Sequence, residues 1–198
     1  VTLSTTTGGM VATLVSAADA VLLTADAGDI TVGSVTATGG TAGLTLNGAD
    51  ASATVATTAF SGQFGDYIKL ISNAGNIDAT TATFGGKTGA TATDAENFTI
   101  AGKITDKLDT TSLGRVTVKA NTVFVNSGAS VANGLATAAS GNTVKFDGVA
   151  YTGAPFTVDT ASLTLDAASG ASGLSFTLGS ANTVSLAGVG AINVTGNA

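Results

Sequence analysis

The 198-residue sequence predicts an all-β protein built as a β-solenoid, a right-handed parallel β-helix with about twenty residues per turn. Three observations predict this fold: short strands that alternate apolar residues with Thr or Ser, corners rich in Gly, Asn and Asp, and similar sequence frames that recur about every twenty residues. We expect one domain over residues 1–198.

The predicted strands are short runs rich in Val, Leu, Phe and Thr, and each ends at or just before Gly, Asn or Asp. Representative runs are GLTLNG (43–48), YIKLIS (67–72), RVTVKA (115–120), TVKFDG (143–148) and LSFTLG (174–179). Alternation of this kind places one set of side chains in a core and the other set outside.

Residues 10–23 are compatible with two interpretations. Their apolar residues recur at i, i+3, i+4 and i+7, as on one face of a helix, but the same segment also reads as strands. We therefore expect residues 1–23 to form either an N-terminal strand or a helix that caps the solenoid.

The repeat is clearest in the frames NTVFVN, NTVKFD, SLTLDA and NTVSLA, which begin at Asn121, Asn142, Ser162 and Asn182. Solenoid corners need residues that tolerate positive φ or a tight bend. We expect Asn121, Asn142 and Asn182 to lie at one corner and to form a ladder of side-chain amides between turns. Pro155 is expected in a loop or at an edge. The alternative fold is a Greek-key or jelly-roll β-sandwich that serves as a filament subunit, because its strand spacing produces similar alternation.

The segment VLLTADAGDITVGSVTATGGTAGLTLNGADASATV (residues 21–55) resembles the repeats of secreted β-helix proteins of the filamentous-haemagglutinin and autotransporter-passenger type. The resemblance is compositional and extends to residues 141–194. It implies an extracellular bacterial surface protein with an adhesive or structural role. The short chain favours a small subunit that assembles over a self-secreting adhesin.

Composition argues against several classes of partner. The formal net charge is −6, only 10% of residues are charged, and no basic cluster occurs, so we expect no binding to nucleic acid. The mean hydropathy is +0.43, but no apolar run approaches the ~18 residues of a spanning helix, so we expect no membrane insertion. The sequence has no His and no Cys, which removes the usual general base, disulfides and thiolate metal ligands.

Carboxylates are the remaining candidates for ligand chemistry. Asp26 and Asp29, and likewise Asp106 and Asp109, are spaced three apart and are candidate Ca²⁺ ligands, although the nonapeptide of calcium-binding β-rolls is absent. We otherwise expect no cofactor and no catalytic residue. Acids aligned on a solenoid face could act on polysaccharide, but Arg115 is the single arginine and Trp is absent, which leaves little to hold a sugar.

The two ends of the sequence suggest a function. VTLSTTTGG and GAINVTGNA each form an alternating strand without the Lys, Pro or inward charge that blocks edge pairing. We expect the strands with Val1, Thr2 and Leu3, and with Ile192 and Val194, to associate with other copies. The predicted function is a self-assembling, non-catalytic subunit of an extracellular filament, surface layer or biofilm matrix. A glycan-binding adhesin is the alternative, and a polysaccharide-active enzyme is the least favoured.

Overall fold

The computed structural model describes the backbone of residues 1–5, 10–17, 21–25, 30–37, 43–47, 57–61, 63–64, 69–72, 76–80, 83–84, 87–102, 104–179 and 182–195. Side chains are described for residues 1–4, 10–15, 76, 78–80, 87–102, 104–179 and 182–195. The chain forms two compact units, Val1–Ala120 and Asn121–Ala198. That residues 1–198 form one domain stays a prediction.

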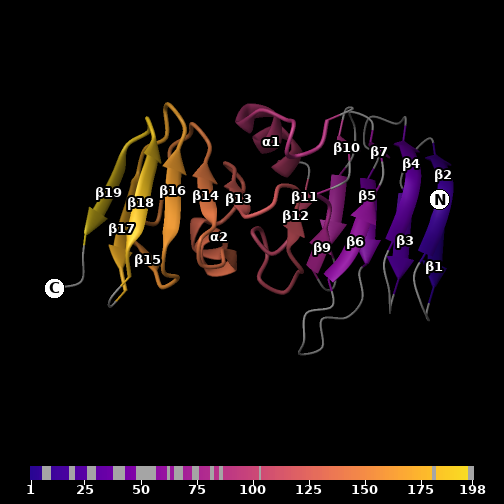
Figure 1. Cartoon of the computed structure of the whole chain (residues 1–198), viewed down its shortest axis with the longest axis horizontal. Helices are drawn as coiled ribbons and strands as arrows, with labels where there is room; N and C mark the ends of the chain where they lie inside the picture. Colours follow the sequence, from indigo (N-terminus) through magenta and orange to yellow (C-terminus); the bar gives the residue numbers. More distant parts are fainter. Residues whose placement is uncertain are drawn as a thin grey trace. The chain divides into compact units, whose positions relative to one another are not determined.

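The first unit contains two five-stranded parallel sheets (Figure 1). One sheet has, in spatial order, β1 (Thr2–Thr5), β3 (Val21–Ala25), β5 (Gly43–Asn47), β8 (Lys69–Ser72) and β11 (Ile104–Thr105). The other has β2 (Met10–Ala17), β4 (Ile30–Ala37), β6 (Thr57–Ser61), β9 (Asn76–Asp78) and β12 (Val116–Thr117). A small sheet pairs β7 (Gln63–Phe64) with β10 (Thr83–Phe84). The chain thus adds one strand to each long sheet in turn, as a solenoid does.

The length of each coil varies along the first unit. Thr2 pairs with Leu22 and Met10 with Ile30, so the first coil advances by about twenty residues. The later step from Leu70 to Ile104 is longer and contains the helix α1 (Asp94–Ala101). The middle of the chain therefore carries insertions between coils.

The second unit is more regular. One sheet has β13 (Thr122–Val125), β14 (Thr143–Phe146), β16 (Leu163–Ala167) and β18 (Val184–Gly188), and the other has β15 (Phe156–Val158), β17 (Leu174–Leu178) and β19 (Ile192–Thr195). Lys145 pairs with Asp166, which is 21 residues further along the chain, and the same step relates β13 to β14 and β16 to β18.

Every strand pair in the described residues is parallel. A Greek-key or jelly-roll sandwich would need antiparallel sheets, so the β-sandwich alternative is wrong and the β-solenoid is confirmed. In the part of the chain that the structure describes, two helices interrupt the strands: α1 and α2 (Val131–Thr137).

The helical interpretation of residues 10–23 is wrong. Residues Met10–Ala17 and Val21–Ala25 form β2 and β3, which pair with β4 and β5. The apolar stripe that suggested a helix is also compatible with strands, and the backbone hydrogen bonds of neighbouring coils favour the strands. Pro155 lies directly before β15, the outermost strand of its sheet, as expected.

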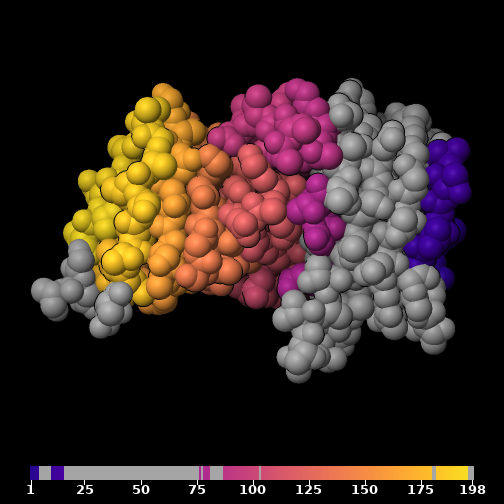
Figure 2. Space-filling model, viewed as in Figure 1, coloured from indigo at the N-terminus to yellow at the C-terminus, as the bar shows by residue number. Residues whose placement is uncertain are grey.

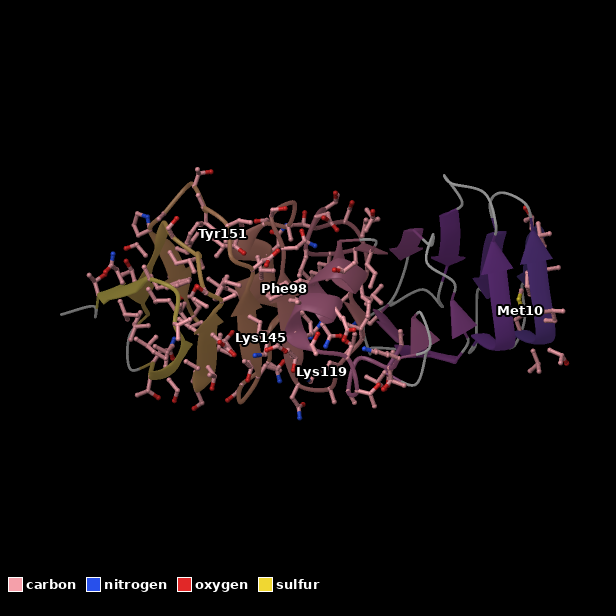
Figure 3. All side chains as sticks on the ribbon, turned by 90° about the horizontal axis from the view of Figure 1, so that it is seen from above. Met10, Phe98, Lys119, Lys145 and Tyr151 are labelled. Carbon is pink, nitrogen blue, oxygen red and sulfur yellow. The ribbon has the colours of Figure 1, made fainter. Side chains whose placement is uncertain are left out.

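The core of the second unit consists of inward side chains that stack from coil to coil. Phe146 and Phe176 are fully buried, and their ring centroids lie 5.6 Å apart. Tyr151, labelled in Figure 3, packs edge-on against Phe146, and its hydroxyl donates to the Val125 carbonyl at 2.8 Å. Contacts of this kind fix the position of one coil on the next, because inward apolar side chains of neighbouring coils pack against each other.

The helix α2 lies against the first coil of the second unit. Its N-cap is Ser130, whose hydroxyl accepts from the Asn133 N–H at 3.3 Å. A Cβ on Gly134 would lie 2.5 Å from Val125 Cγ2, so the close approach of the helix to β13 requires glycine there. The helix also contacts β15, the outermost strand of its sheet. A helix against an outer strand is one way in which proteins protect a sheet edge.

Candidate functional site: the two end coils

The last coil of the second unit leaves the core uncovered. Val123, Val144, Leu165 and Leu186 occupy one inward column of β13, β14, β16 and β18. Their exposed fractions are 2%, 0%, 0% and 56%. Leu186 is therefore a core residue by position and a surface residue by exposure, because none of the described residues forms a coil beyond it.

The second face of this coil has the same character. Ile192 and Val194 on β19 pair with the buried Leu174 and Phe176 on β17, yet both are only half-buried. The predicted assembly residues Ile192 and Val194 thus lie at inward positions of the end coil. Leu186, which the sequence analysis missed, is the more exposed inward position.

The backbone at this end is also unpaired on one side. β18 and β19 are each last in their sheets, and none of the described strands lies on their outer sides. Figure 2 shows this part of the surface in yellow. No ionisable side chain follows Asp166 in the sequence, so neither strand carries a charge that would block pairing. Asp166 itself forms an ion pair with Lys145, which is labelled in Figure 3.

The first coil of the first unit has comparable features. β1 and β2 are each last in their sheets, and no ionisable side chain precedes Asp19. The predicted assembly residues Val1, Thr2 and Leu3 are all exposed. The described side chains of this coil are coloured indigo in Figure 2.

Two further apolar side chains on β2 point into solvent. Val11 is 85% exposed and Leu14 is 65% exposed. Their partners one coil further on are Thr31 and Ser34, which are polar. A comparison of the frames 10–17 and 30–37 would have identified both residues from the sequence, because an apolar residue at an outward position replaces Thr or Ser.

The exposed large apolar side chains share one property. Among the side chains that the structure describes, all of them belong to the first or last coil: Val1, Leu3, Val11, Leu14, Leu186 and Val189. Apolar surface concentrated on unpaired strands marks an interaction site or an aggregation hazard.

The predicted asparagine ladder does not form as expected. Asn121 and Asn142 are in register, but Asn182 lies two residues before Val184, the residue that pairs with Leu163 in their column. The Asn142 side chain instead accepts from the Ala139 N–H at 3.1 Å, and Asn182 donates to the Val158 carbonyl at 3.0 Å. The similar NTV sequences were misleading because successive strands of this sheet are 21 residues apart, whereas Asn182 follows Asn142 by 40 residues.

Asp106 and Asp109 do come together, in the loop between β11 and β12. Both oxygens of the buried Asp106 accept backbone N–H groups, from Leu108 and Val116, each at 2.8 Å. Asp109 accepts from the Asp106 N–H at 2.9 Å. Burial raises the pKa of Asp106 to about 6, whereas the two N–H donors act in the opposite direction. These hydrogen bonds close the loop between β11 and β12. Ca²⁺ binding by Asp106 and Asp109 stays a prediction. Asp26 and Asp29, the other candidate ligands, lie outside the described residues.

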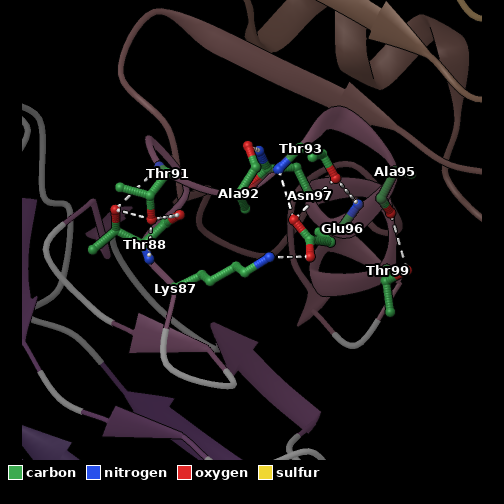
Figure 4. Close-up of polar contacts among 9 residues, drawn as sticks. All are labelled: Lys87, Thr88, Thr91, Ala92, Thr93, Ala95, Glu96, Asn97 and Thr99. Atoms are coloured by element: carbon green, nitrogen blue, oxygen red, sulfur yellow. Dashed lines mark hydrogen bonds and ion pairs between the residues drawn. The ribbon is translucent and has the colours of Figure 1, made fainter.

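A second polar cluster holds the start of α1 (Figure 4). Thr93 is the N-cap, its hydroxyl accepts from the Glu96 N–H at 3.3 Å, and the Glu96 carboxylate accepts from the Thr93 N–H at 2.8 Å. The ion pair with Lys87, followed by the bonds from Thr93, lowers the pKa of Glu96 to about 2. Asn97 is fully buried and donates to the Gly89 and Ala92 carbonyls. These contacts anchor the insertion.

Within the described residues, no group of three or more Asp, Glu, His or Cys side chains is placed to hold a metal ion. In the same part of the chain, every helix is too short or too polar to cross a bilayer. The sequence matches no protein-family model, and comparison with curated proteins and with solved structures also gives no match.

Proposed function

We propose that this protein is a non-catalytic structural subunit that assembles with copies of itself through its end coils, in an extracellular filament, surface layer or biofilm matrix. The observation that carries the proposal is the exposure of Leu186 at an inward position of the last coil, where it is 56% exposed while Leu165 in the same column is fully buried. The outer strands of the first and last coils, β1, β2, β18 and β19, have no described strand beyond them and carry no ionisable side chains.

The physical basis is the stacking that already joins the coils of each unit. A further coil placed on β18 and β19 would bury Leu186, Ile192 and Val194 and would supply partners for the outer N–H and C=O groups of both strands. Apolar burial contributes roughly 25 cal/mol per Å², and the backbone bonds give direction to the contact. The extracellular location is supported by the compositional resemblance to secreted β-helix repeats.

Aromatic side chains do not favour the glycan-binding alternative. A sugar site usually offers an exposed ring, but the rings described here are buried or half-buried: Phe98, Phe124, Phe146, Tyr151, Phe156 and Phe176. A catalytic role has no support from the polar clusters, whose groups are engaged in loop closure and helix capping.

Self-assembly is tested by sedimentation velocity and negative-stain electron microscopy over a wide concentration range. We expect the parent protein to form regular assemblies as the concentration rises. Leu186→Lys should raise the concentration at half-assembly at least about tenfold, because an ammonium group would be buried among apolar side chains. Ser185→Lys is the matched control: it adds the same charge at the neighbouring exposed position. A parent protein that stays monomeric throughout would refute the proposal.

A further inference from the structure

We infer that the surface covering β18 and β19 is the first coil, β1 and β2, of a second copy of this chain, so that copies join with a fixed polarity. This inference rests on the proposed self-assembly. It adds the identity of the two surfaces and excludes contacts between two identical ends.

The last coil defines what its partner must provide. The partner needs extended backbone with free pairing groups, since β18 and β19 are outermost in their sheets. It must also be uncharged where it meets Leu186, because a charge in this apolar column would lose its hydration without compensation. A partner must meet both requirements at once, because the same contact pairs with β18 and β19 and covers the column that ends at Leu186.

The first coil meets both requirements. β1 and β2 are also outermost strands, and the sequence before Asp19 contains no ionisable side chain. Leu3, Val11 and Leu14 give this coil exposed apolar surface that the contact would cover at least in part. The other ends of the two units differ: α2 lies against the first coil of the second unit, and Arg115 and Lys119 flank β12.

Strand direction distinguishes a last coil stacked on a first coil from contacts between two last coils or two first coils. Within both units each coil is followed by a coil whose strands run parallel to it. A last coil placed on a first coil continues that order, with parallel pairing on both faces. Two last coils placed face to face reverse the direction of the chain, so that β18 would pair antiparallel with its own copy in a contact with twofold symmetry.

End-blocked variants distinguish these arrangements. Leu3→Lys places a charge on the first coil, in the column that Leu23 and Leu46 continue, and Leu186→Lys places one on the last coil. Both positions are exposed, so folding should persist. If copies join last coil to first coil, each variant alone is monomeric, because it keeps only one competent end. An equimolar mixture should then form a one-to-one dimer of twice the 18.9 kDa subunit mass. Folding of each variant is checked by circular dichroism and thermal unfolding.

Cross-linking supplies an independent measurement, because the natural chain has no cysteine. Ser4→Cys and Ser185→Cys introduce thiols at exposed positions on β1 and β18. A short bismaleimide should link a mixture of the two variants and leave each variant alone unlinked. Both variants retain the apolar end residues, so they report on the contact even if a lysine variant fails to fold.

The outcomes separate the two proposals. Dimers of Leu3→Lys alone, or cross-links in Ser185→Cys alone, would show contact between two last coils and overturn the inference while leaving self-assembly intact. Dimers of Leu186→Lys alone, or cross-links in Ser4→Cys alone, would do the same for two first coils. A parent protein that never associates would overturn the proposed function and this inference together.

Discussion

Leu165 and Leu186 occupy the same inward position in successive coils, yet Leu165 is fully buried and Leu186 is 56% exposed. The two side chains are chemically identical and differ in one respect: Leu165 has a described coil on both sides, and Leu186 has one on a single side. Comparing substitutions of these two leucines measures how much a further coil contributes to the free energy of unfolding.

Leu165→Ala should lower the free energy of unfolding by about 2 to 5 kcal/mol, because it leaves a cavity in a closed core. Leu186→Ala in the dilute, unassembled protein should lower it by less than about 1 kcal/mol, because solvent already reaches this side chain. Urea unfolding at low concentration measures both. Equal losses would mean that Leu186 is covered even in the monomer.

Alanine substitution at two corner glycines with similar φ should lower the free energy of unfolding by different amounts. Gly141 (φ +82) has no atom within 4 Å of an added Cβ, whereas at Gly173 (φ +73) that Cβ would lie 2.1 Å from the Tyr151 carbonyl oxygen. Gly141→Ala should cost about 1 kcal/mol from left-handed backbone strain alone. Gly173→Ala should cost about 3 kcal/mol or more, because the neighbouring coil must also shift. Thermal unfolding of the two variants compares them, and a similar loss in both would contradict the close approach of coils at Gly173.

Asp106 should make stability depend on pH. Its pKa is raised from 3.8 to about 6 in the folded protein, so the folded state binds the proton more tightly than the unfolded state. The free energy of unfolding should therefore fall as pH rises from about 4 to about 6, by on the order of 2 to 3 kcal/mol. The pKa of Glu96 is lowered to about 2, so its contribution is lost only at more acidic pH.

The corresponding measurement is chemical unfolding at several pH values. Asp106→Asn should remove this decrease in stability, whereas Asp94→Asn, at a half-exposed position in the first turn of α1, should retain it. Persistence of the decrease in Asp106→Asn would assign it to another group.

Asn142 stabilises its corner through the backbone rather than through an amide ladder. Asn142→Val should cost about 1 to 3 kcal/mol, because the Ala139 N–H loses its acceptor. Thr143→Val, at the next and only half-buried position, should change stability by less than about 0.5 kcal/mol. An unchanged thermal midpoint for Asn142→Val would show that water replaces the side chain.

Much of the fold could be predicted because solenoid coils are local repeats. Alternating runs such as TVKFDG identified strands, and Gly and Asn identified corners, since each depends on a few neighbouring residues. The helix α2 was not predicted, because its residues VANGLAT show no clear apolar period and its packing depends on the close approach of Gly134 to Val125. The carboxyl pair Asp106 and Asp109 was noted, but the Val116 N–H that Asp106 binds lies ten residues away in the chain.

The sequence by itself determined the solenoid class, the approximate length of a coil and the absence of ionisable side chains before Asp19 and after Asp166, because these follow from period and composition. Only the tertiary structure decided the step of 21 residues between strands of the β13-β14-β16-β18 sheet, which places Asn182 outside the predicted ladder. It also separated Leu165 from Leu186, two leucines in similar alternating strands. Burial depends on which coils lie on either side of a residue, and that relation is set by packing between segments distant in the chain.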